Sequence, residues 1–289
     1  MESLLECMTV CEKATRVGGD VIQDWAGKFD VSKKGPADLV TQADLASQQA
    51  ISRTIWEVFP SHCIIGEEDA GLPMYPNAPI RHAEYRWIID PLDGTINFVH
   101  GVPHYAVSLA LERQGEVLVA AVLDPLQNEC FTAVAGQGAR LNGQPIHTSG
   151  VTSLLESLGA VGFPPGVGRD SPDLLVFLQA ILHCQAIRRS GSTALNLAYL
   201  AAGRYDVFWS FSSKIWDVAA GILLLREAGG SICSPDGQIY RLDQRPFLAA
   251  ANPTLLGKLY EIVTKAIKGG PATNYMLPGG EGRGMELDK

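Results

Sequence analysis

The order of strand-like and helix-like runs changes near residue 150, and this change is the strongest constraint on the fold. Before it, the apolar runs YAVSLAL, VLVAAVL and ECFTAVA are separated by the turn signals RQGE and DPLQN. Such spacing predicts an antiparallel meander from Tyr105 to about Ala135. Apolar periodicity also predicts helices over 2–26 and 41–59 and short strands at 62–65 and 86–89. The first half is therefore expected to pack helices against an antiparallel sheet.

Each of the two N-terminal helices is expected to bury one apolar face. For the first helix the predicted face consists of Leu4, Leu5, Met8 and Cys11. For the second it consists of Ile51, Ile55, Val58 and Phe59, which follow the i, i+4, i+7, i+8 spacing of an amphipathic helix.

After residue 150 strands and helices alternate, which is typical of an α/β layer. The strands are expected at 158–162, 185–189, 206–210 and 246–252, and the helices at 172–183, 192–202, 216–228 and up to about 267. We therefore predict an N-terminal α+β subdomain over 1–150 and a C-terminal α/β subdomain over 151–268. The glycine-rich segment 269–289 is expected to be a disordered tail.

Composition limits the classes of function. Of the 289 residues, 46% are hydrophobic, which is enough for a substantial core. With 23 basic and 31 acidic residues, the net charge of -8 lacks the positive patch expected of a nucleic-acid binder. The opening MESLLECMTV carries acids instead of a basic leader, and no run of 18 apolar residues is present. We expect a soluble cytoplasmic protein with no membrane or nucleic-acid partner.

The six cysteines are scattered, with no CxxC pair. This pattern indicates small apolar residues in a reducing compartment. His100 and His104 lie four residues apart, but the glycine and proline between them disfavour the helix that would align them on zinc. We therefore interpret both histidines as structural or surface residues.

The stretch WIIDPLDGTINFVHG, residues 87–101, places two aspartates where an apolar strand ends. Pro91 favours an extended backbone at Asp90, and Gly94 permits a tight turn after Asp93. Two carboxylates held close repel each other unless a cation lies between them, and oxygen-only clusters suit Mg²⁺ or Mn²⁺. A short helix beginning at Gly94 or Thr95 would offer N–H groups to an anion such as phosphate.

Other acidic residues could join this pair, although each has a plainer interpretation. Glu67 and Glu68 in IIGEED follow another apolar strand, where a solvated acidic loop is equally plausible. Asp44, three residues after Thr41, matches a capping box. Asp217 falls in the first turn of a predicted helix, where an acid is favourable in any case.

Three motifs together resemble the inositol monophosphatase family. They are GEE at 66–68, WIIDPLDGTINFVHG, and WDVAAGILLLREAGG at 216–230, and the likeness runs from about residue 5 to 267. The resemblance implies a five-layer αβαβα sandwich, with an antiparallel sheet in the N-terminal half and a mixed or parallel layer in the C-terminal half. It also implies Mg²⁺-dependent hydrolysis of a phosphate monoester, lithium sensitivity and a homodimer.

The resemblance also implies roles for individual residues. Glu67, Asp90 and the carbonyl of Leu92 would hold a first Mg²⁺, and Asp90, Asp93 and Asp217 a second. Glu67 would also serve a third, weaker ion beside the Lys33–Pro36 loop, and Mn²⁺ could replace Mg²⁺. Asp44 and Thr95 would activate the attacking water together with Glu67, while the N–H groups of Gly94 and Thr95 would receive phosphate oxygens.

The same likeness suggests where the rest of the substrate lies. Gly191, Ser192 and Thr193 would line its alcohol portion, beside Asp93 and Asp217, although an ordinary helix cap explains the two hydroxyls equally well. Ser210 stands where the family usually carries a glutamate that grips ring hydroxyls. Lys214, close by, could favour a second anionic group, but an exposed lysine with no such role is the plainer interpretation.

Several functions stay open at this point. The first is hydrolysis of inositol 1-phosphate or a related sugar or cyclitol monophosphate. Alternatives are the same chemistry on fructose 1,6-bisphosphate, histidinol phosphate or an adenosine 3′,5′-bisphosphate. A noncatalytic, cation-binding regulatory protein is a candidate from another class. A dinucleotide-binding Rossmann module is disfavoured because no G-x-G-x-x-G follows a strand.

Overall fold

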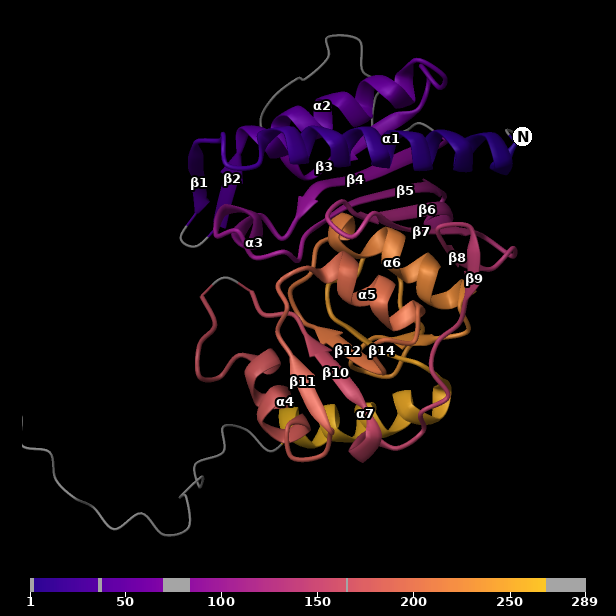
Figure 1. Ribbon diagram of the computed structural model, residues 1–289. Helices are drawn as coiled ribbons and strands as arrows, with labels where there is room; N and C mark the ends of the chain where they lie inside the picture. Colours follow the sequence, from indigo (N-terminus) through magenta and orange to yellow (C-terminus); the bar gives the residue numbers. More distant parts are fainter. Residues whose placement is uncertain (1–2, 36–37, 70–83, 165, 269–289) are drawn as a thin grey trace, which may run out of the picture.

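The computed structural model describes residues 3–35, 38–69, 84–164 and 166–268, and they form five layers (Figure 1). Helices α1 (Leu4–Trp25) and α2 (Gln42–Trp56) cover one face of a seven-stranded sheet. Helices α5 (Thr193–Ala201) and α6 (Ile215–Glu227) lie between this sheet and a five-stranded one. Helices α4 (Pro172–Ala180) and α7 (Pro253–Lys268) form the outer layer beyond the second sheet. The expected αβαβα sandwich is confirmed.

The larger sheet has the strand order β3-β4-β5-β6-β7-β8-β9. Its bounds are Cys63–Gly66, Arg86–Asp93, Ala106–Arg113, Glu116–Asp124, Glu129–Val134, Ala139–Leu141 and Gln144–Ile146. The predicted meander is confirmed in β5, β6 and β7, which pair antiparallel. The sheet is not wholly antiparallel, because β3 runs parallel to β4. The hairpin β1–β2 (Val31–Gly35 and Asp38–Thr41) lies apart from it, beside α3 (Thr95–Val99).

The smaller sheet has the order β11-β10-β12-β14-β13 and is mixed, as expected. Strands β11 (Ala186–Arg188) and β12 (Val207–Ser210) run parallel to β10 (Leu158–Val161). Strand β14 (Phe247–Ala250) is antiparallel to β12 and to the edge strand β13 (Ser231–Cys233). The division into subdomains at residue 150 stays a prediction, and the predicted tail, 269–289, lies outside the described residues.

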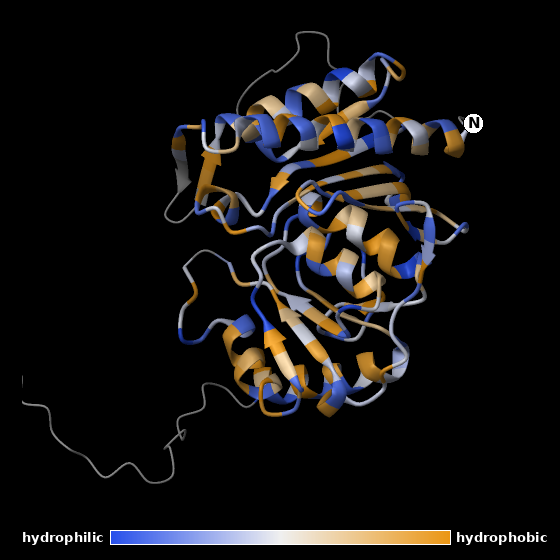
Figure 2. Ribbon diagram, in the orientation of Figure 1, coloured by the Kyte–Doolittle hydropathy of each residue, from blue (hydrophilic) through white to orange (hydrophobic). Residues whose placement is uncertain are grey.

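The hydropathy of each helix follows its layer (Figure 2). Helix α6 is buried at every position from Val218 to Leu225, because it has a sheet on either side. A Cβ at Gly221 would come within 2.4 Å of Leu197, so this glycine allows α5 and α6 to pack closely. The outer helices instead alternate between hydrophobic and hydrophilic residues. No helix within the described ranges is long and apolar enough to cross a membrane.

The predicted buried faces of α1 and α2 need correction. On α1 the predicted Cys11 is fully buried and the predicted Met8 packs against the core, but Leu5 is 75% exposed. The buried face also includes Cys7, Val10, Ala14 and Ile22. On α2 the predicted Ile51 and Ile55 are fully buried, but Val58 lies beyond the helix end and is 43% exposed. On α1 the position of the sheet decides which apolar residues are buried, whereas on α2 the helix ends before Val58, and the predicted Phe59 is buried.

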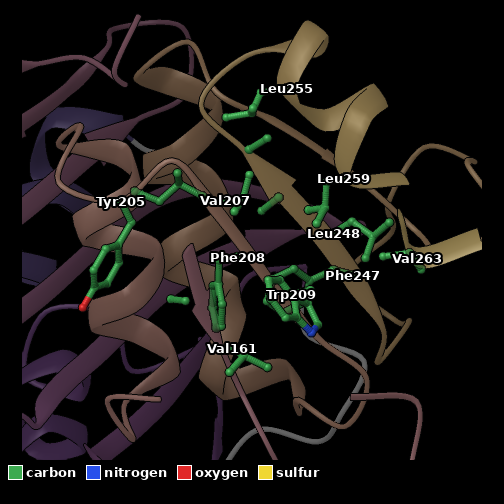
Figure 3. Close-up of a cluster of buried hydrophobic side chains, with 14 of the residues drawn as sticks. Val161, Tyr205, Val207, Phe208, Trp209, Phe247, Leu248, Leu255, Leu259 and Val263 are labelled. Carbon is green, nitrogen blue, oxygen red and sulfur yellow. The ribbon is translucent and has the colours of Figure 1, made fainter. Parts of the chain in front are cut away.

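The core around the smaller sheet is built from aromatic and aliphatic side chains (Figure 3). Phe208 and Phe247 pack edge to face with ring centroids 5.1 Å apart, and Trp209 is fully buried beside them. Leu255 and Leu259 of α7 close this core from outside. Because aromatic residues bury large areas in fixed geometry, this layer provides a rigid base for the loops at its strand ends.

Candidate active site

The two aspartates of DPLD lie at the end of β4. This strand runs through Asp93, longer than predicted, and its register shifts between Asp90 and Asp93. Gly94 then has a φ of 100°, and a Cβ there would lie 3.1 Å from the carbonyl oxygen of His104. Only glycine accepts both conditions easily. The chain turns directly into α3, which confirms the short helix predicted at this point.

Distant segments bring their acidic residues to one small cavity of about 190 Å³, which we call the acid cavity. Its lining includes the predicted metal-binding residues Glu67, Asp90, Leu92, Asp93 and Asp217. Gly94, Thr95 and Gly191 line it as well, together with Leu39 and Ile96. Four carboxylates separated by up to 150 positions in the sequence therefore face a common space.

Ser108 of β5 explains how Asp217 comes near Asp90. It is paired with Asp90 across the sheet, is 1% exposed, and donates a hydrogen bond of 3.3 Å to the carbonyl oxygen of Trp216. This bond fixes the start of α6 against the larger sheet. Sequence reasoning missed this residue, and the signal was a single polar position inside the apolar run YAVSLAL.

The carboxylates of the acid cavity are buried close to one another, which disfavours their charged forms. Burial, followed by the charges of Glu67, Asp93 and Asp217, raises the pKa of Asp90 well above its ordinary value. Burial raises the pKa of Asp93 to about 6, although hydrogen bonds from Ser192 and the backbone oppose the rise. Burial and the charge of Asp93 raise the pKa of Asp217 to about 8. A bound cation would remove this destabilisation.

Backbone and cap groups hold each aspartate in place. Asp93 Oδ2 accepts hydrogen bonds of 2.6 Å from Ser192 Oγ and from the Ala194 N–H, at the N-terminus of α5. Asp217 Oδ2 accepts one of 2.7 Å from the Lys214 N–H, at the start of α6. In both cases the partial positive charge of a helix start favours the carboxylate. The carboxylates are therefore positioned by core helices.

The donor set fits a hard divalent cation, because it contains only oxygen atoms. Within the described ranges, however, no three His, Cys, Asp or Glu side chains are grouped closely enough to hold an ion by themselves. The carboxylates thus face one cavity without forming a closed cage. Ligation would need further oxygen atoms, such as the predicted carbonyl of Leu92 or water.

Asp44 connects two roles that the sequence presented as alternatives. Its Oδ2 accepts hydrogen bonds from the Thr41 N–H (2.8 Å) and Thr41 Oγ1 (2.7 Å), which completes the predicted capping box of α2. Its Oδ1 lies 3.1 Å from Thr95 Oγ1, which is also 3.1 Å from the carbonyl oxygen of Leu92. A hydroxyl has one proton, so Thr95 donates to one of these acceptors at a time. The cap and the Asp44–Thr95 pair therefore coexist.

Only some of the predicted substrate-binding residues line the acid cavity. Gly191, at a φ of 93°, lines the acid cavity. Ser192 caps α5 by accepting from the Leu195 N–H at 3.2 Å, and it also donates to Asp93. Ser210 is 2% exposed and accepts a hydrogen bond from Ser213 Oγ at 2.8 Å. Ser210 does not belong to the described lining of this cavity.

Neighbouring residues differ in whether they follow the plainer interpretation. Glu68 is buried, so the IIGEED segment is not simply a solvated loop. The Lys214 amine lies 5.2 Å from the centre of the Trp216 ring. The His104 ring packs edge-on against Tyr199 at 5.8 Å, and burial lowers its pKa. Part of the predicted Lys33–Pro36 loop lies outside the described residues.

Asn97 is a further residue that the sequence did not reveal. Its Nδ2 lies 2.6 Å from the carbonyl oxygen of His104 and 2.8 Å from that of Ser190. It thereby ties α3 to the loop before α5. A Cβ at Gly191 would lie 2.7 Å from Asn97 Nδ2, so glycine makes this close approach possible. No periodicity or motif distinguishes such a bridge in the sequence.

Comparisons with known proteins identify the class to which this fold and site belong. The model of the inositol monophosphatase family matches residues 4–268, so the chain belongs to this family. Membership places it among the phosphatases of that superfamily, which are metal-dependent.

Particular relatives differ in name. Nus factor SuhB of Pseudomonas aeruginosa is 42% identical over 231 residues, which cover 78% of this chain and 84% of that protein. Inositol-1-monophosphatase of Rhizobium meliloti is 42% identical over 210 residues, covering 72% and 77%. The crystal structure of extragenic suppressor protein suhB from Bartonella henselae is similar with a TM-score of 0.83, at 35% identity, covering 90% of this chain and 99% of that one.

Proposed function

We propose that the protein is a Mg²⁺-dependent phosphomonoesterase that hydrolyses inositol 1-phosphate or a related small sugar or cyclitol monophosphate. The observation that carries this proposal is the meeting of Glu67, Asp90, Asp93 and Asp217 at one cavity, next to the Thr95–Asp44 pair. A structural cation site would need no such hydroxyl–carboxylate pair. The same-fold alternatives act on fructose 1,6-bisphosphate, histidinol phosphate or an adenosine 3′,5′-bisphosphate.

The cofactor is proposed to bind at the acid cavity. Two to three Mg²⁺ ions, or Mn²⁺, held by Glu67, Asp90, the Leu92 carbonyl, Asp93 and Asp217, would supply a water of lowered pKa and neutralise charge on the phosphoryl group. Every other contribution comes from the chain itself.

The Asp44–Thr95 pair is proposed to orient the attacking water. Asp44 is 1% exposed and anchored by Thr41, so its Oδ1 can hold the Thr95 hydroxyl in a fixed direction. The hydroxyl oxygen can then accept a hydrogen bond from the water, and Glu67 lines the same cavity. The N–H groups of Gly94 and Thr95 would receive phosphate oxygens. Attack is in line with the leaving alcohol, and no covalent phosphoenzyme is needed.

A substrate panel tests this proposal. The full chain is assayed for phosphate release from inositol 1-phosphate and the three alternative substrates, with Mg²⁺ and then with excess EDTA. We expect release that requires the metal and that lithium inhibits. Activity that persists after complete metal removal would overturn the metal mechanism.

A second candidate is a noncatalytic role, which the name Nus factor of the Pseudomonas relative supports. In that case the acid cavity would bind a cation for structural reasons only, and the panel would show no turnover. Cytoplasmic location and a homodimer are also proposed from the family resemblance. Light scattering on the purified chain tests the dimer.

A further inference from the structure

A second cavity of about 330 Å³ adjoins the acid cavity, and we call it the arginine cavity. The two cavities share Ile96 and Gly191 in their linings. A substrate that presents its phosphate to the acid cavity would therefore extend its leaving alcohol toward the arginine cavity. The volume suits a small organic group.

The walls of the arginine cavity are largely apolar, and one cation lies among them. Val161, Phe163 and Val167 contribute apolar surface, and Arg189 is the single charged residue in the described lining. The Arg189 guanidinium lies 5.6 Å from the centre of the Phe163 ring, within cation–π distance. Phe163 in turn packs edge-on against Phe177 of α4 at 5.8 Å. This aromatic support limits the positions that the arginine can adopt.

Arg189 forms no ion pair within the part of the chain that the structure describes. Other arginines do, since Arg86 pairs with Glu112 and Arg204 with Glu129. The chain has a net charge of -8, yet this cation lies beside a substrate cavity and pairs with no carboxylate of the described residues. It is therefore available to bind an anion from solution. A guanidinium also binds carboxylate or phosphate through two hydrogen bonds at once.

Several neutral polar atoms in the lining of this cavity already form hydrogen bonds within the protein. Asn97 Nδ2 lies within hydrogen-bond distance of two backbone carbonyls, and Asn196 Oδ1 accepts from Ser190 Oγ. Ser192 Oγ donates to Asp93 and accepts from the Leu195 N–H. A hydroxyl-rich leaving group would have to compete with these bonds at Asn97, Asn196 and Ser192, whereas an anionic one can bind Arg189 directly.

We propose that the arginine cavity is an anion subsite, and that the preferred substrates are phosphate monoesters whose leaving alcohol carries a second anionic group. This inference rests on the proposed phosphatase function and narrows its substrate class. The second anionic group that binds Arg189 is either a carboxylate or a second phosphate, and the choice of substrates distinguishes the two.

Matched substrate pairs test the inference in the full chain with Mg²⁺. Glycerol 3-phosphate is compared with 3-phosphoglycerate for the carboxylate, and fructose 1-phosphate with fructose 1,6-bisphosphate for the phosphate. In at least one pair, kcat/KM should be about tenfold higher for the more anionic member. Arg189→Gln should bring that ratio close to one. Arg188→Gln, an exposed neighbour outside the cavity lining, should leave the ratio unchanged.

A binding measurement separates this inference from the proposed function. Calorimetry compares 3-phosphonopropionate with propylphosphonate, which cannot be hydrolysed and differ in one carboxylate. Tighter binding of the former that Arg189→Gln abolishes supports the subsite even if no ester is turned over, and then the phosphatase proposal alone fails. Turnover without discrimination in either substrate pair, or a ratio that Arg189→Gln leaves intact, overturns the subsite and leaves the phosphatase proposal standing.

Discussion

The acid cavity and the arginine cavity adjoin each other but differ in the sign of their charges and in how those charges are held. In the acid cavity, charges of one sign are buried together and fixed by backbone and cap hydrogen bonds. In the arginine cavity, one exposed charge rests on an aromatic ring. The first arrangement lowers the stability of the fold unless a cation binds, and such an arrangement is typical of a functional site. The exposed arginine lowers stability little, and it can be replaced without disturbing the fold. Such a position is well suited to set substrate preference.

The largest expected effect comes from removing one charge of the acid cavity. Asp93→Asn should lower kcat about 100- to 1,000-fold, because the amide is a poor ligand for a divalent cation. The amide oxygen can still accept from Ser192 and the buried charge is removed, so the melting temperature measured without Mg²⁺ should not fall. Phosphate release and thermal melts measure the two effects. Asp170→Asn, at an exposed acid outside both cavities, is the control. A large loss of stability with unchanged kcat would favour a structural site instead.

Magnesium should stabilise the protein through the acid cavity alone. Binding to the folded state at about 100 times Kd adds about 2.7 kcal/mol, which corresponds to a rise in melting temperature of about 5 °C. Differential scanning fluorimetry with and without Mg²⁺ measures the rise. Asp90→Asn should abolish most of it, whereas Arg189→Gln should preserve it. An equal rise in both variants would mean that the ion binds elsewhere.

Ser192 lies at the junction of the two cavities, since it lines one and holds an aspartate of the other. Ser192→Ala removes the cap of α5 and one hydrogen bond to Asp93, so stability should fall by about 1 kcal/mol. The kcat should fall about tenfold, as is usual when the partner of a metal-binding residue is lost. Urea melts and steady-state kinetics check both values. Ser192→Thr should restore part of each, and a variant with normal kcat would show that Asp93 needs no such support.

The smallest effect on activity is expected for Asp173, a buried acid outside both cavity linings. Burial raises its pKa to about 6, although a 2.9 Å hydrogen bond from the Phe211 N–H opposes the rise. An acid with a raised folded-state pKa destabilises the fold increasingly as the pH rises from about 4 to 6. Asp173→Asn should therefore stabilise the protein by about 1 to 2 kcal/mol at pH 7.5 and by about a third as much at pH 4.5. Urea melts at both pH values test this, and a gain independent of pH would contradict it.

Sequence periodicity was sufficient for the longer elements and failed where elements are short. The meander and the alternating second half were predicted correctly because several residues repeat each pattern. Strands β8, β9 and β13 have three residues each, too few to show alternation. The exposure of Leu5 depends on where the sheet lies, which local spacing does not contain.

The site shows the same limit. Spacing alone indicated a cation at DPLDGT and a helix after it; the helix is confirmed, and the cation site stays a prediction. It could not bring Asp217 to Asp90, because that contact depends on Ser108 and the packing of α6. The family motifs supplied this link. Asn97 and the Arg189–Phe163 pair had no motif, since they exist only through tertiary contact.

Helices α5 and α6 lie between two sheets, and their first turns hold Asp93 and Asp217. Small shifts of these helices, of a size that leaves secondary structure intact, would change the distance between the two carboxylates. Heating should consequently weaken ion affinity several degrees before cooperative melting begins. The affinity of the site for its ion therefore depends directly on how tightly α5 and α6 are packed between the two sheets.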